Sequence, residues 1–156
     1  MSRKSPRSVL IIEARFYEDI ADELARGAIE ELEGRRIEYE RIAVPGSLEI
    51  PLALSLALAN GFVGRAGRHR GCIALGCVIR GETAHYDIVA RESATGLYTL
   101  AVDHAVPLGN GILTCDSREQ ALARASVTGR DKGGDAARAC LALMHLEEHF
   151  SSASRR

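Results

Sequence analysis

Residues Cys72-Ile-Ala-Leu-Gly-Cys-Val-Ile-Arg-Gly-Glu-Thr-Ala-His-Tyr-Asp87 contain the local pattern that decides the fold. An apolar strand over 72–78 runs into a polar, glycine-containing turn, and a long helical pattern begins near His85. A strand, such a turn and a helix N-terminus point backbone N–H groups and the positive end of the helix dipole at one spot, which suits an anion. His85 adds an imidazole that gains or loses a proton near neutral pH. This segment therefore predicts a strand–turn–helix unit that combines anion binding with acid–base chemistry.

The same alternation of strand and helix extends over the rest of the chain. Short aliphatic and β-branched runs alternate with segments in which apolar residues recur at helical spacing. The expected strands are 9–12, 36–44, 72–78 and 106–114, and the expected helices are 17–33, 49–59, 85–103, 118–126 and 135–149. This order predicts an α/β fold with a four-stranded parallel sheet flanked by helices on both faces. One domain is expected over residues 9–150, between a flexible segment at 1–8 and a disordered tail at 151–156.

The composition narrows the class of protein. The chain has 156 residues, 46% of them hydrophobic and 26% charged, with a net charge of −1, as in ordinary globular proteins. Basic and acidic residues nearly balance, so the charge gives no sign of binding to nucleic acid or to an acidic membrane surface. The sequence has neither a signal-peptide pattern nor a membrane span, so a cytoplasmic location is expected. The four cysteines have no metal-ligand spacing, so we expect reduced thiols in the core and no metal site.

Residues that follow the expected strands are the candidates for a site, because ligands of open parallel sheets bind beyond the carboxyl ends of the strands. Phe16 is either a packing residue or a face on which a planar heterocycle stacks. Glu49 either complements the dipole of the second helix or accepts hydrogen bonds from a ligand, with Ser47 beside it. His85 is either a surface histidine or a proton carrier beside the anion-binding turn.

Basic side chains offer further candidates. Arg80 is expected to pair with an acidic group, either on a ligand or on Asp87. Arg124 and Lys132 flank a turn at 128–134 and fit a solvated basic face. That turn lacks the residue order of a P-loop, and no Gly-x-Gly-x-x-Gly follows the first strand, so nucleotide hydrolysis and dinucleotide binding lose support.

Two motifs in order, Pro45-Gly-Ser-Leu-Glu-Ile-Pro51 and the segment 76–87, resemble the 6,7-dimethyl-8-ribityllumazine synthase family. The resemblance extends from about Val9 to the last helix. It implies a flavodoxin-like three-layer αβα sandwich and a transferase of riboflavin biosynthesis that uses no cofactor and no metal. The implied reaction, the penultimate step of that pathway, condenses 5-amino-6-(D-ribitylamino)uracil with 3,4-dihydroxy-2-butanone 4-phosphate to give the lumazine, phosphate and water.

The resemblance also implies site residues and partners. Phe16 would stack on the pyrimidine, and the ribityl chain would be held by Ser47 and Glu49, with Leu48 also contacting substrate. The other implied contacts are backbone groups of Val78 and Ile79 at the ring edge, N–H groups of Glu82 and Thr83 at the phosphate, His85 for proton transfer, and Asn110 and Arg124 from a neighbouring subunit. The family forms its sites between subunits of a homopentamer. Riboflavin synthase is a candidate partner protein.

The chain departs from the family pattern at three places. Tyr17 stands where an asparagine often follows the stacking aromatic, and Asn110 stands where many members have an aromatic. The turn at 128–134 differs from the pattern common in members that build sixty-subunit shells, which favours a free pentamer. Two other functions stay open: a protein that binds flavins or lumazines without efficient catalysis, and an assembly unit in which catalysis is secondary.

Overall fold

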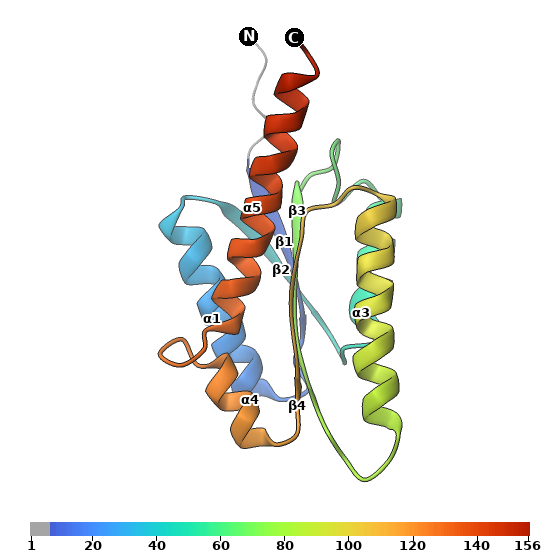
Figure 1. The fold of residues 1–156 in the computed structure, drawn as a ribbon, viewed down its shortest axis with the longest axis vertical. Coiled ribbons are helices and arrows are strands. Elements are labelled where there is room, and N and C mark those ends of the chain that lie inside the picture. Colours follow the sequence, from blue (N-terminus) through green and yellow to red (C-terminus); the bar gives the residue numbers. More distant parts are fainter. Residues whose placement is uncertain (1–6) are drawn as a thin grey trace.

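Four parallel strands form the middle layer of the molecule (Figure 1). A computed structural model of the chain describes residues 7–156. The strands are β1 (Ser8–Ala14), β2 (Glu38–Val44), β3 (Gly71–Ile79) and β4 (Leu108–Cys115), hydrogen-bonded in the order β2-β1-β3-β4. From β1, the chain adds β2 at one edge of β1 and later adds β3 at the opposite edge of β1. Such a reversal opens a crevice at the carboxyl ends of the strands.

Helices cover both faces of this sheet. One outer layer holds α1 (Glu18–Gly34), α4 (Arg118–Ala125) and α5 (Lys132–Ala153), and the other holds α2 (Glu49–Ala59) and α3 (His85–Asp103) (Figure 1). The expected α/β three-layer sandwich with a four-stranded parallel sheet is thereby confirmed.

The central strands are buried on both faces, which explains their continuous apolar sequence. In β1, Val9 and Ile11 pack in the core under α1, α4 and α5, whereas Leu10 and Ile12 pack in the core under α2 and α3. All four side chains are fully buried. Because side chains alternate along a strand, one apolar run supplies both cores.

Several element bounds differ from those expected, and the second strand begins at Glu38 rather than at 36. The first strand begins at Ser8, inside the segment expected to be flexible, and residues 1–6 of that segment lie outside the described residues. The fourth strand begins at Leu108 rather than at 106; Pro107, which has no N–H to donate, precedes it and accepts a hydrogen bond from Cys72 through its carbonyl oxygen. The last helix is longer at both ends than the expected 135–149.

A side-chain cap at the start of α5 and a side-chain hydrogen bond in its last turns accompany the greater length of this helix. The carboxylate of Asp131 accepts a hydrogen bond from the backbone N–H of Gly134 at 3.2 Å, so the glycines at the start of α5 are helical rather than part of a turn. At the other end, the Ser151 hydroxyl donates to Glu147 at 3.0 Å, one turn earlier. The helix continues to Ala153, so the tail expected to be disordered from Ser151 begins inside it.

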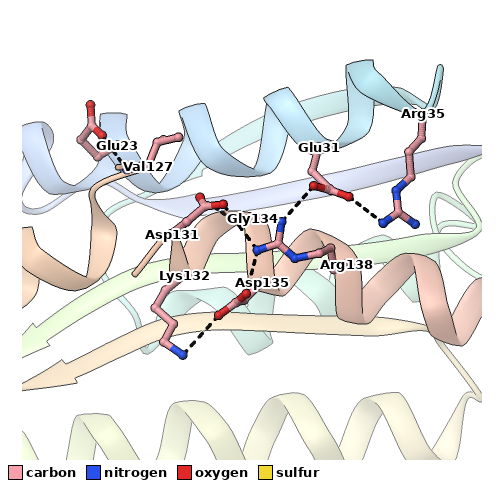
Figure 2. A network of polar contacts seen from close by, with 9 residues as sticks. All are labelled: Glu23, Glu31, Arg35, Val127, Asp131, Lys132, Gly134, Asp135 and Arg138. Carbon is pink, nitrogen blue, oxygen red and sulfur yellow. Dashed lines mark hydrogen bonds and ion pairs between the residues drawn. The ribbon is translucent and has the colours of Figure 1, made fainter. Parts of the chain in front are cut away.

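A polar network ties the start of α5 to α1 (Figure 2). The Arg138 guanidinium donates to Glu31 of α1 at 2.9 Å and to Asp135 at 2.7 Å. The hydrogen bond from Arg138 lowers the pKa of the Asp135 carboxyl. In the turn between α4 and α5, the backbone N–H of Val127 donates to Glu23 of α1 at 3.2 Å. These contacts hold the turn at 128–131, which is shorter than the expected turn at 128–134 because 132–134 belong to α5.

A second polar cluster lies at the amino ends of the strands. His69 is 3% exposed, and its two ring nitrogens lie 2.5 Å from the Ser8 hydroxyl and 3.0 Å from the Glu40 carboxylate. The imidazole thereby links β1, β2 and the loop before β3. Within residues 7–156, no helix has the length and apolar character needed to cross a membrane.

Candidate active site

A pocket of about 480 Å³ lies beyond the carboxyl ends of β1, β2 and β3, beside the start of α3. Its lining residues come from four separate segments: Phe16 and Tyr17; Pro45, Gly46, Ser47, Leu48 and Glu49; Cys77, Val78 and Ile79; and Gly81, Thr83, His85, Tyr86 and Val89. Eight of the residues expected from the sequence therefore line one pocket: Phe16, Ser47, Leu48, Glu49, Val78, Ile79, Thr83 and His85.

Phe16 stands between β1 and α1, and the residue is 74% exposed. The neighbouring Tyr17 ring meets it edge to face, with the ring centroids 4.9 Å apart. A phenylalanine that packs in a core is buried, so the packing interpretation of Phe16 fails in this subunit. The exposed face suits a planar ligand.

The turn between β2 and α2 places a hydroxyl and a carboxylate on the pocket wall. Ser47 is 6% exposed, and it can approach β3 because Gly76 has no side chain: a Cβ there would lie 2.8 Å from the Ser47 oxygen. Glu49 is the first residue of α2 and is exposed, so its carboxylate complements the helix dipole and also faces the pocket. The two interpretations of Glu49 are compatible.

The turn before α3 presents backbone donors. The Thr83 hydroxyl accepts from the backbone N–H of His85 at 3.4 Å. Within the described residues, the N–H groups of Glu82, Thr83 and Ala84 have no protein acceptor. Glu82 is exposed and its side chain is not part of the pocket wall. The turn therefore combines unpaired donors, a helix N-terminus and an imidazole, as the sequence predicted.

The cysteine in the pocket wall is an unreactive thiol. Burial is the main cause that raises the pKa of Cys77 to about 12, and burial also raises the pKa of the nearby Cys115. A thiol with so high a pKa stays protonated at neutral pH and is a poor nucleophile. All four cysteines are free and buried, which confirms the expectation of reduced core thiols. Among residues 7–156, no three His, Cys, Asp or Glu side chains gather where they could hold a metal ion.

Several pocket residues were given no site role by the sequence analysis. They are Tyr17, Pro45, Gly46, Cys77, Gly81, Tyr86 and Val89. Most are chain neighbours of a motif residue, and Val89 lies one helical turn after His85. Residues four positions apart lie on the same face of a helix, so the spacing from His85 was the available signal that Val89 faces the pocket.

Asn110 and Arg124 lie elsewhere, in a second hollow of about 400 Å³ along the exposed edge of β4. Lys132 and Asp135 of α5 also line it, and it shares no lining residue with the first pocket. The amide oxygen of Asn110 accepts from the N–H of Ile112 at 3.0 Å, and Arg124 donates to the carbonyl oxygen of Gln120 at 3.4 Å. The expected residues therefore form two separate sets within this structure.

Comparison with known proteins agrees with this geometry. The model of the family described as 6,7-dimethyl-8-ribityllumazine synthase matches residues 6–148. A protein of that name from Beijerinckia indica is 52% identical over 141 residues, covering 90% of this chain and 76% of the relative. 6,7-Dimethyl-8-ribityllumazine synthase 1 of Rhizobium meliloti is 49% identical over 152 residues, covering 97% of this chain and 99% of the relative. A third relative of the same family, from Methylorubrum populi, is 52% identical over 139 residues, or 89% of this chain and 82% of the relative. Motifs, fold and relatives agree, and the chain belongs to the 6,7-dimethyl-8-ribityllumazine synthase family.

Proposed function

We propose that the pocket at the carboxyl ends of β1, β2 and β3 condenses 5-amino-6-(D-ribitylamino)uracil with 3,4-dihydroxy-2-butanone 4-phosphate. Phe16 stacks on the pyrimidine, and backbone groups of Val78 and Ile79 meet the ring edge. Ser47 and Glu49 hold the hydroxyl groups of the ribityl chain, with Leu48 beside them. The single observation that supports this proposal most is that these residues, from three separate segments, line one pocket with the turn at 81–85.

The chemistry requires proton transfer and phosphate departure. The primary amine of the uracil attacks the ketone, and the adduct loses water to form an imine. The butanone carbon chain then expels phosphate, and the enol left behind becomes a new carbonyl group. The second amine attacks this carbonyl, and loss of a second water completes the ring. Each step moves a proton, and no step transfers an electron to or from an external carrier. An imidazole suits repeated proton transfer near neutral pH, and His85 stands beside the donors of Glu82 and Thr83. Holding two substrates in reactive geometry supplies much of the acceleration.

The second hollow completes the site of a neighbouring subunit. Arg124 binds the phosphate there, because a guanidinium matches phosphate oxygens, and Asn110 forms a polar wall. Within one subunit these two residues are separate from the first pocket. A homopentamer, in which each subunit gives one pocket and one hollow, brings the two sets together. Native mass spectrometry tests this directly, and the expected mass is five times the 16.8 kDa subunit.

The reaction is tested by mixing both substrates with the purified chain. We expect one phosphate to be released for each lumazine formed, followed by phosphate assay and by the absorbance of the lumazine. Release of neither product, with both substrates present at high concentration, would eliminate the proposed activity. Binding of a lumazine without turnover would instead support the alternative of a binding protein.

Arg124→Ala should chiefly weaken the phosphate-bearing substrate. Loss of a charge-assisted pair to the phosphate raises the KM for that substrate by about tenfold to a hundredfold. The KM for the uracil should change much less. Arg130→Ala is the matched control, because Arg130 is an exposed arginine outside both cavities. An effect confined to the uracil would contradict the assignment of Arg124.

The chemistry of the chain supports a proposed location, and the chemistry of its product supports a proposed partner protein. The four cysteines are free, which fits a reducing compartment, so the proposed location is the cytoplasm. The enzyme that consumes the lumazine, riboflavin synthase, is the proposed partner protein.

A further inference from the structure

Arg80, the residue after β3, connects two segments at the carboxyl end of the sheet. Its Nε donates to the Asp116 carboxylate, just after β4, at 3.0 Å. Its Nη1 lies 3.8 Å from the Asp87 carboxylate, and its guanidinium carbon lies 4.4 Å from the centre of the Tyr86 ring. Asp87 and Tyr86 belong to the first turn of α3. One side chain therefore joins the start of α3 to the loop that follows β4.

The contacts continue from Asp116 toward the second hollow. The backbone N–H of Asp116 donates to the side-chain oxygen of Gln120 at 2.9 Å. The carbonyl oxygen of the same Gln120 accepts from Arg124 at 3.4 Å. A polar chain thus runs from the first turn of α3, through Arg80, to the residue assigned to the phosphate of the neighbouring site.

Direct binding of an anion by Arg80 does not fit these contacts. Two carboxylates, Asp116 and Asp87, already surround the guanidinium, and they would repel a phosphate. Arg80 is also absent from the wall of both cavities. The sequence left open whether Arg80 pairs with an acidic ligand or with Asp87. The structure shows it paired with protein carboxylates, those of Asp87 and Asp116.

The first turn of α3 needs such an anchor. Its N-cap residue, Ala84, has no side chain that can cap the helix, and the turn carries His85. Tyr86 lines the pocket as well as contacting Arg80, so the guanidinium supports a wall of the site. We propose that Arg80 is a positioning residue that holds His85 and the first turn of α3 against the start of α4. This inference rests on the roles proposed above for His85 and Arg124.

The expected effect of removing Arg80 falls on turnover rather than on stability. The Arg80 side chain is 52% exposed and its partner Asp116 is 67% exposed, and exposed ion pairs contribute little to folding. A small misplacement of a catalytic group lowers the rate strongly. Arg80→Met should therefore lower kcat by about tenfold, change the KM for either substrate by less than about threefold, and leave the unfolding midpoint near that of the parent chain.

The test uses three single variants, one double variant and one control in the full-length assembled protein. Arg80→Lys, which keeps the charge, should restore part of kcat. Asp116→Asn should lower kcat in the same direction, and adding it to Arg80→Met should cause little further loss, because both act through one contact. Arg26→Met is the control: Arg26 is also exposed and paired with two carboxylates, on α1. The control should show the parent kcat.

Three results would overturn the inference. Full kcat in Arg80→Met would remove the role, and a raised KM for the phosphate substrate alone, with Asp116→Asn harmless, would make Arg80 a ligand instead. NMR of the His85 imidazole gives a readout that needs no turnover: its resonances should move in Arg80→Met and not in Arg26→Met. Unchanged His85 resonances in Arg80→Met would contradict the inference, whether or not the parent chain is active. Absence of phosphate release by the parent chain would separately refute the proposed activity.

Discussion

Gly133→Ala is expected to destabilise the fold by about 3 kcal/mol or more. Gly133 lies in the first turn of α5, where the helix meets α1, and a Cβ at this position would lie 1.9 Å from the carbonyl oxygen of Leu24. It would also lie 2.8 Å from the carbonyl carbon of Leu24. Both atoms are backbone in the middle of α1, so no flexible side chain can move aside. The two helices would have to separate, and the core beneath them would open.

Urea unfolding followed by circular dichroism measures this change. Gly34→Ala is the matched control, because Gly34 also lies at a helix end but a Cβ there would meet nothing within 4 Å. The control should be neutral or more stable by up to about 1 kcal/mol, since alanine reduces the freedom of the unfolded chain. Equal stability of the two variants would show that the α1–α5 contact is looser than the structure has it.

His85→Ala is expected to lower turnover by roughly a hundredfold or less, with little change in KM. The imidazole transfers protons in the proposed reaction, whereas binding and orientation of the two substrates depend on other groups. The measurement is a steady-state assay with both substrates varied. The remaining activity should stay well above the rate without enzyme.

His104→Ala provides the comparison on the same helix. His104 is the exposed C-cap of α3, at the end far from the pocket, and it has no role in the site. Its removal should leave kcat and both KM values at the parent level. A full parental rate in His85→Ala would remove His85 from proton transfer and leave positioning as the main source of catalysis.

The order of the elements was predictable because hydrophobic periodicity is a local property. All four strands and all five helices occur within a few residues of where the sequence predicted them. Ser117 caps α4 by accepting from the N–H of Gln120 at 3.2 Å. The start of α5 was not predictable in the same way. Glycine is a poor helix former, so the sequence at 133–134 predicts a turn. The structure shows that glycine is needed at 133 because the backbone of α1 comes too close for a larger residue.

The candidate site was predictable only in part. Motif residues such as Ser47, Glu49 and His85 follow strands whose carboxyl ends meet, so their convergence in one pocket followed from the topology. The partner of Arg80 was left open by the sequence, because Asp116 lies thirty-six positions away and only the pairing of β3 with β4 brings it near.

The sequence by itself determined the layered fold, the family and the residue types at the ends of three strands. Each of these depends on short segments, their hydrophobic periodicity or motifs, and the order in which they occur. The family resemblance implied that Asn110 and Arg124 act from a neighbouring subunit, but only the tertiary structure showed the hollow on the outer edge of β4 in which they lie, apart from the pocket lined by Phe16 and His85. That separation depends on strand order and on how α4 and α5 pack against the sheet. Packing of this kind joins residues distant in the chain, so no local pattern could reveal it.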